Sequence, residues 1–141
     1  MPILNKVAQI AVKPFQGTIS PKSHAALDYV IIGSLLASAG WFWSRNKRAA
    51  LAALICGGAQ LGLNLLTEYG EGRKPIGFRT HREIERGLGA MTATMPEFLG
   101  FKDSREKTLF QIQGVITTVL AELTDDGRKP AYRYSRRPSA A

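Results

Sequence analysis

Two short stretches of the sequence repeat one arrangement of a histidine and an acid. "SHAALDYV" places His24 four residues before Asp28, and "THREIERG" places His81 four residues before Glu85. These are the only histidines in the chain. Because residues four apart share one face of a helix, each pair would present an imidazole beside a carboxylate. Such groups are ligands for iron, manganese or zinc, and they can also relay protons.

Two further acids extend this set of candidates. Glu68 in "LTEYG" and Asp125 in "LTDDG" each follow a long apolar segment. In an up-and-down bundle, the ends of these segments return to the end at which the histidine turns begin. The candidates for a metal site or a proton path at this end are therefore His24, Asp28, Glu68, His81, Glu85 and Asp125.

A simpler interpretation gives these residues a structural role. Thr80 and Glu83 have the spacing of a helix capping box, and the histidines can pair with neighbouring acids to form a polar rim. The Glu-x-x-His spacing of known metal sites in helical bundles is absent from the chain. The sequence therefore favours a structural rim with no metal and no cofactor. Metal binding and an ion or proton path are the alternatives.

Long apolar segments would position these residues. From Ala25 to Trp43 the only charged residue is Asp28, and Ala49 to Thr67 has none, a length close to that of a membrane-spanning helix. The uncharged runs of the second half, Gly87 to Phe101 and Thr108 to Ala121, are shorter. No strand pattern with a period of two is present. The pattern predicts an all-α, four-helix membrane bundle. A soluble four-helix bundle that binds an apolar ligand is the alternative.

The two halves of the chain align when one is shifted by a constant interval (81 − 24 = 57). The same shift places Asp28 on Glu85, Gly57 on Gly114, and "LTEYG" on "LTDDG". This self-similarity predicts two tandem helical hairpins. We expect an N-terminal amphipathic arm over 1–19, a four-helix membrane domain over 20–127, and a basic disordered tail over 128–141. The two repeats cover about 20–72 and 77–127.

The distribution of charge predicts an orientation. The formal net charge is +8, and 13 of the 19 lysines and arginines lie in the N-terminal segment up to Lys22, between Arg73 and Arg86, or in the tail. If the helices span a membrane, these segments share one side, and the positive-inside rule places both termini in the cytoplasm. We therefore expect the cell (inner) membrane and no nucleic acid partner. The tail residues expected to bind lipid headgroups are Arg128, Lys129, Arg133, Arg136 and Arg137.

Small residues predict where helices pack closely. Gly58 and Gly62 are four residues apart, and Gly33 and Gly89 each precede an alanine by four residues. This spacing permits close approach of two helix backbones. We expect these glycines to pack inside one bundle, and a dimer face is the alternative. The single cysteine, Cys56, excludes an intrachain disulfide and a multi-cysteine metal site.

Matching stretches recur at the helix ends of both repeats. They are "HAALDYVIIGSLL", "LLTEYGEG", "RTHREIERGLG" and "MPEFLGF". These stretches resemble the H-x-x-L-D-Y, L-T-D-Y-E-x-G and S-P-W-L-x-G-F motifs of the SPW repeat family of small bacterial integral membrane proteins. The resemblance covers about Ser23 to Gly127. It departs from the family at Ala39, where the motif has proline, and at Glu97, where it has tryptophan. The resemblance implies a two-helix tandem repeat in a membrane and no assigned activity.

No motif of an enzyme is present. The sequence has no nucleophile–base arrangement, no glycine-rich phosphate loop and no paired acids of a hydrolase. We therefore expect a non-enzymatic multi-pass membrane protein, a structural or accessory subunit in the lipid bilayer. It would pack with itself as a homo-oligomer or with a larger membrane complex, and no small-molecule substrate is identified. The alternative is an ion- or proton-conducting or metal-binding membrane protein that uses the histidine–carboxylate rim.

Overall fold

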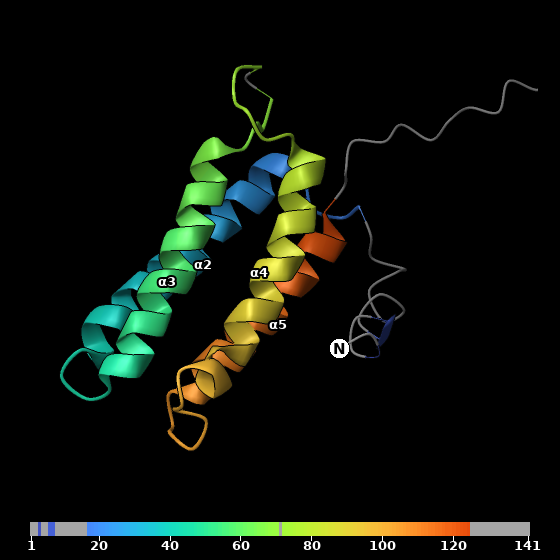
Figure 1. Cartoon of the computed structure of the whole chain (residues 1–141). Helices are drawn as coiled ribbons and strands as arrows, with labels where there is room; N and C mark the ends of the chain where they lie inside the picture. The colour runs from blue at the N-terminus through green and yellow to red at the C-terminus, as the bar shows by residue number, and fades with distance from the viewer. Residues whose placement is uncertain (1–2, 4–5, 8–16, 71, 125–141) are drawn as a thin grey trace, which may run out of the picture.

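The described part of the chain is built from α-helices. A computed structural model describes residues 3, 6–7, 17–70 and 72–124. Its long helices are α2 (Pro21–Phe42), α3 (Lys47–Leu66), α4 (Phe78–Phe98) and α5 (Lys107–Leu123) (Figure 1). Within these residues the only β-pairing is two isolated bridges. The prediction of an all-α, four-helix bundle is confirmed at this level. Most of the predicted arm and the whole of the predicted tail, with Asp125, lie outside the described residues.

Local sequence sets where the first two helices begin. Ser20 caps α2 by accepting a hydrogen bond from the Ser23 N–H at 3.3 Å, and Pro21 occupies the first helical position, where its missing N–H costs nothing. Asn46 caps α3 by accepting from the Ala49 N–H at 3.2 Å. The turn between these helices is short, so α2 and α3 lie antiparallel.

The start of α4 differs from the predicted one. The helix begins at Phe78 with Gly77 as its N-cap and has no side-chain cap. Thr80 and Glu83 therefore lie inside the helix, and the predicted capping box is wrong. Pro96 lies within the last turn of α4. Gly77 is extended and has no side chain, so no N-cap side chain accepts from the free N–H groups of the first turn.

The helices pack as two pairs. α2 packs mainly against α3 and α4 mainly against α5, while α3 with α4 and α2 with α5 make smaller contacts (Figure 1). Two short main-chain contacts join the ends of the pairs: Ile19 N–H donates to Leu123 at 3.3 Å, and Ile76 N–H donates to Leu66 at 3.1 Å. Donors and acceptors of these contacts are separated by the same interval (76 − 19 = 123 − 66 = 57).

Two glycines permit the close contact between α4 and α5. A Cβ atom on Gly114 would lie 2.5 Å from the Gly89 carbonyl oxygen, and one on Gly89 would lie 2.5 Å from Thr118 Oγ1. Gly89 therefore lies at a contact inside the bundle. In contrast, Gly33, Gly58 and Gly62 have open space where a Cβ would project. These three glycines do not mediate a close contact within the bundle.

We predict that Gly114→Ala destabilises the bundle by about 2 kcal/mol, because the new methyl group overlaps a backbone oxygen that cannot move alone. The measurement is thermal unfolding in mild detergent, followed by circular dichroism. Gly58→Ala is the matched control: its Cβ meets no atom within 4 Å, so a neutral effect or a slight gain is expected. Equal losses in both variants would contradict the assigned contact.

Polar and apolar side chains are distributed unusually for a water-soluble bundle. Buried side chains include His24, Asp28, Asn64, His81 and Glu85. Large apolar side chains are exposed on every long helix, among them Val30, Trp41, Leu51, Ile55, Leu65, Ile84, Phe98, Ile112 and Val115. Among the described residues, α2 and α3 are long and apolar enough to span a membrane, a criterion that some soluble core helices also meet. Both observations support an association with membranes.

Candidate functional site

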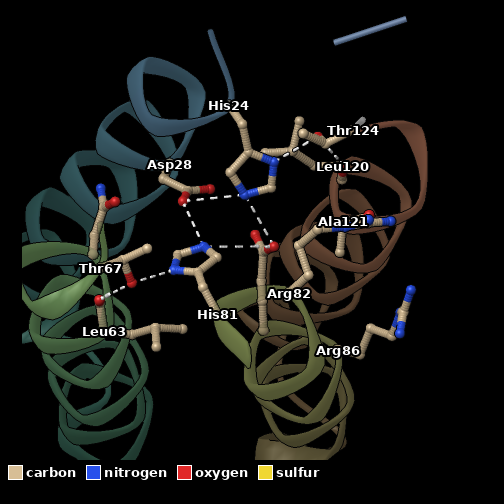
Figure 2. Close-up of polar contacts among 12 residues, drawn as sticks. His24, Asp28, Leu63, Thr67, His81, Arg82, Arg86, Leu120, Ala121 and Thr124 are labelled. Carbon is tan, nitrogen blue, oxygen red and sulfur yellow. Dashed lines mark hydrogen bonds and ion pairs between the residues drawn. The ribbon is translucent and has the colours of Figure 1, made fainter. Parts of the chain in front are cut away.

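Four of the predicted site residues meet in the interior of the bundle. His24 and Asp28 come from α2, and His81 and Glu85 come from α4; we call these four residues the quartet. Their exposed fractions are 0%, 6%, 1% and 3%, so water reaches none of them freely. One ligand atom from each side chain lies within 4.8 Å of all the others. The two histidine–acid pairs that the sequence spacing predicted therefore form a single buried cluster (Figure 2).

The contacts of the quartet cross between the two helix pairs. His24 Nε2 lies 3.0 Å from Glu85 Oε2 and 3.4 Å from Asp28 Oδ2. His81 Nε2 lies 3.3 Å from Asp28 Oδ2 and 3.8 Å from Glu85 Oε2. For each histidine the shorter contact is therefore with the acid of the other helix. The sequence spacing predicted the pairing within one helix but not this exchange.

A threonine holds the other nitrogen of each imidazole. His24 Nδ1 is 2.6 Å from Thr124 Oγ1, and His81 Nδ1 is 2.7 Å from Thr67 Oγ1 (Figure 2). The Thr124 hydroxyl donates its hydrogen to the Leu120 carbonyl oxygen at 2.8 Å, and the Thr67 hydroxyl donates its hydrogen to the Leu63 carbonyl oxygen at 2.6 Å.

These hydrogen bonds decide the tautomer of both rings. Because each threonine hydroxyl has given away its only hydrogen, its oxygen acts as an acceptor toward the imidazole. The Nδ1 atoms of His24 and His81 therefore carry hydrogens and donate them. In the neutral ring, this leaves the lone pair on Nε2, the atom that faces the carboxylates.

Several atoms at the centre of the quartet lack hydrogen-bond partners. His24 Nε2, His81 Nε2 and Glu85 Oε2 are buried, and none makes a contact with the geometry of a hydrogen bond. They are close enough for electrostatic interaction but are not aligned for proton sharing. Four donor atoms thus point toward one centre while three of them remain unsatisfied within the protein.

Aromatic rings surround the imidazoles. The Phe78 ring stacks on His81, with ring centroids 5.8 Å apart and planes inclined by 15°, and its edge contacts His24 at 5.4 Å. The Tyr69 hydroxyl donates to Asn64 Oδ1. Burial, together with the nearby carboxylates of Asp28 and Glu85, raises the pKa of Tyr69 above its usual range. Tyr69 therefore remains a neutral hydrogen-bond donor beside the quartet.

Nearby cations are engaged elsewhere. Arg86 Nε lies 2.5 Å from Glu122 Oε1, and Arg82 Nε donates to the Ala121 carbonyl oxygen at 2.7 Å. Both contacts join α4 to α5. Among the described residues, the two imidazoles are the basic side chains within 4.0 Å of the Asp28 and Glu85 carboxylates.

Glu68, the fifth candidate, does not join the quartet. Its carboxylate accepts main-chain hydrogen bonds in the following loop, from Gly70 at 2.7 Å, Arg73 at 2.8 Å and Lys74 at 3.1 Å. Hydrogen bonds from Gly72, Arg73, Gly70 and Lys74 lower the pKa of Glu68 from 4.5 to about 2. Glu68 therefore organises the loop that leads to α4. Asp125, the sixth candidate, lies outside the described residues.

We predict that Glu68 makes the loop sensitive to acid. Because its pKa is lower in the folded chain, its contribution to stability is fully present above about pH 4.5 and is lost as the pH falls toward 2. The difference in free energy of unfolding between the wild type and Glu68→Gln should therefore shrink over this range. Denaturant titrations at a series of pH values measure it. A difference that does not change with pH would contradict the assignment.

Sequence reasoning missed Thr67 and Thr124. A signal was present, since the repeated "LT" of "LTEYG" and "LTDDG" places a threonine at the same position in both halves (124 − 67 = 57). Helix periodicity alone does not show that each threonine reaches the histidine of the other half. Of the remaining candidates, the tail residues Arg128, Lys129, Arg133, Arg136 and Arg137 lie outside the described residues.

Comparisons with known proteins do not extend this description. The chain matches no family model, and neither the curated proteins nor the solved structures contain a significant match. Membership of the SPW repeat family stays a prediction from the quoted motifs.

Proposed function

We propose that this chain is a small multi-pass integral membrane protein whose four helices enclose a buried cation-binding centre, the quartet. This proposal depends mainly on one observation: two carboxylates and two imidazoles lie together in the interior, while large apolar side chains are exposed on all four helices. Ionisable groups inside a membrane are costly and mark ion sites or pathways. Among the functions considered from the sequence, this corresponds to the alternative that uses the histidine–carboxylate residues.

The exposed surface supports the membrane part of the proposal. Phe98 and Val30 are 85% and 68% exposed, and Val115 is 61% exposed, so the apolar surface includes the shorter second pair of helices. Large exposed apolar patches are rare on soluble monomers and often mark contact with a membrane or a partner. Trp41 and Trp43 are exposed at the end of α2, where indole rings would lie in the interface between lipid and water. The quartet lies toward the opposite end of the helix.

The proposed arrangement in the membrane is a tandem repeat of two hairpins. The contacts related by an interval of 57 support a duplicated unit whose copies enter from the same side. Under this proposal and the positive-inside rule, the turns near Ser44 and Asp103 would lie outside and the loop after Glu68 in the cytoplasm. The quartet is then nearer to the cytoplasmic surface of the inner membrane.

Fractionation and labelling test this proposal. We expect the protein to remain in the membrane pellet after an alkaline carbonate wash. In a Cys56→Ser background, an impermeant thiol reagent should label Ser44→Cys in intact cells, and it should label Lys74→Cys only after lysis. Both positions are exposed in the structure, so access to the reagent decides the outcome. Recovery of the protein in the supernatant without detergent would instead support the soluble bundle.

A further inference from the structure

The ligand of the quartet can be derived from its donor atoms. Two imidazole nitrogens and two carboxylate oxygens converge from α2 and α4, with neighbouring nitrogen–oxygen distances of 3.0–3.8 Å. A tetrahedral ion bound at roughly 2.0–2.2 Å separates its ligand atoms by roughly 3.3–3.6 Å. The nitrogen–oxygen distances are therefore close to those of a metal coordination sphere, and the full set of ligand atoms, which lie within 4.8 Å of one another, would need to contract only slightly around an ion.

The hydrogen bonds from the threonines prepare both histidines as ligands. Because Thr124 and Thr67 hold the two Nδ1–H groups, the coordinating lone pairs lie on the Nε2 atoms that face the centre. In metalloproteins, the second nitrogen of a ligating histidine is almost always fixed by such a partner. A structural rim would not require Nδ1–H to be fixed in both histidines, because either nitrogen of an imidazole can pair with an acid.

The unpartnered atoms also distinguish a metal site from a rim. His24 Nε2, His81 Nε2 and Glu85 Oε2 are buried without hydrogen bonds, and all belong to side chains that are more than nine-tenths buried. A buried polar group left in this state costs about 1–3 kcal/mol. One cation at the common centre would satisfy all three atoms together with Asp28.

Charge and ligand type narrow the choice of ion. With neutral imidazoles, the two carboxylates carry two negative charges, which a divalent ion neutralises. Calcium and magnesium favour sites made entirely of oxygen, and soft ions such as Cu(I) favour sulfur, whereas mixed imidazole and carboxylate ligands suit zinc, iron and manganese. The set therefore fits a divalent transition-metal ion.

We infer that His24, Asp28, His81 and Glu85 form a binding site for one divalent transition-metal ion, with Thr67 and Thr124 as its orienting partners. This inference rests on the proposed function, since it identifies the class of ion that the proposed cation-binding centre takes. It replaces the structural rim that the sequence favoured. The ion joins α2 to α4 across the diagonal of the bundle and so ties the two helix pairs together.

Zinc titration of the detergent-solubilised full chain tests the inference. The protein is purified without a polyhistidine tag, stripped with a chelator, and titrated by calorimetry. We expect one zinc ion per chain, and we expect binding to fall below detection in Glu85→Gln and His81→Ala. Glu83→Gln is the matched control, because Glu83 is the same residue type on the same helix but its side chain is 58% exposed. Binding should persist in this control.

A measurement on the wild type avoids dependence on variants that fold poorly. X-ray absorption of the zinc-loaded chain should show scattering from two imidazoles, and His24 and His81 are the only histidines available. No zinc binding by the wild type, a spectrum without imidazole, or equal binding by Glu85→Gln would overturn the inference.

The two proposals fail in different ways. A chain that resists carbonate extraction but binds no zinc keeps its place in the membrane and loses the metal site. A chain that binds zinc through two imidazoles but is recovered in the soluble fraction keeps the metal site and loses the membrane assignment.

Discussion

Replacing Thr67 and Thr124 together with valine is expected to weaken zinc binding by about 100-fold, although neither threonine is a ligand. Valine has nearly the shape of threonine, so packing is retained while both acceptors of the imidazole N–H groups are lost. His24 Nδ1–H would then be buried without its partner, His81 Nδ1–H would keep only the longer contact of 3.5 Å to the Tyr69 hydroxyl, and each ring could rotate or change tautomer. Calorimetric titration of the double variant measures the effect.

Thr94→Val is the control for this experiment. The Thr94 hydroxyl also donates to the carbonyl four residues earlier, that of Ala90 at 2.9 Å, but it contacts no histidine and is exposed. Its loss should leave zinc affinity unchanged. If the Thr67 and Thr124 double variant also binds zinc with unchanged affinity, the threonines do not orient the ligands, and the assigned tautomers are wrong.

Phe110→Ala is expected to lower the free energy of unfolding by about 3 kcal/mol or more, because it leaves a cavity that the helices cannot close. Phe110 has an exposed fraction of 0%, and its ring packs against Phe101 with centroids 5.2 Å apart. This pair belongs to the apolar core and lies just after the end of α4 and near the start of α5, away from the quartet. Chemical denaturation in mixed detergent micelles measures the loss.

Phe98→Ala provides the comparison. Phe98 is 85% exposed at the end of α4, so its removal leaves no internal cavity. We expect a change within about 0.5 kcal/mol, as for most surface substitutions. Similar losses in Phe98→Ala and Phe110→Ala would show that the apolar residues of α4 and α5 are not divided between surface and core as described.

Helix positions and the residues of the quartet were readable from the sequence because they depend on local spacing. The apolar segments and their breaks located the four helices, and the interval of four residues placed each histidine on the face of its acid. Reasoning from local sequence failed at the start of α4, where more than one residue could serve as the N-cap. "FRTHREIE" contains a good capping box, yet α4 begins before it at Phe78.

The remaining features of the site depend on contacts between distant segments. Glu68 resembled a fifth ligand in the sequence, but the N–H groups of its own loop bind its carboxylate first. The contact of His24 with Glu85 requires α2 and α4 to approach across the bundle, and no periodic pattern specifies that approach. For the same reason, the depth of the quartet in the interior could not be predicted from its residue types.

The exchange of threonines between the two halves has an evolutionary consequence. His24 depends on Thr124, and His81 depends on Thr67, so neither half contains a complete environment for its own histidine. If both halves descend from one ancestral unit, that ancestor required a second copy of itself to assemble the same centre, as a twofold homodimer. Gene fusion would then have freed the two copies to diverge, as the differing acids Asp28 and Glu85 illustrate.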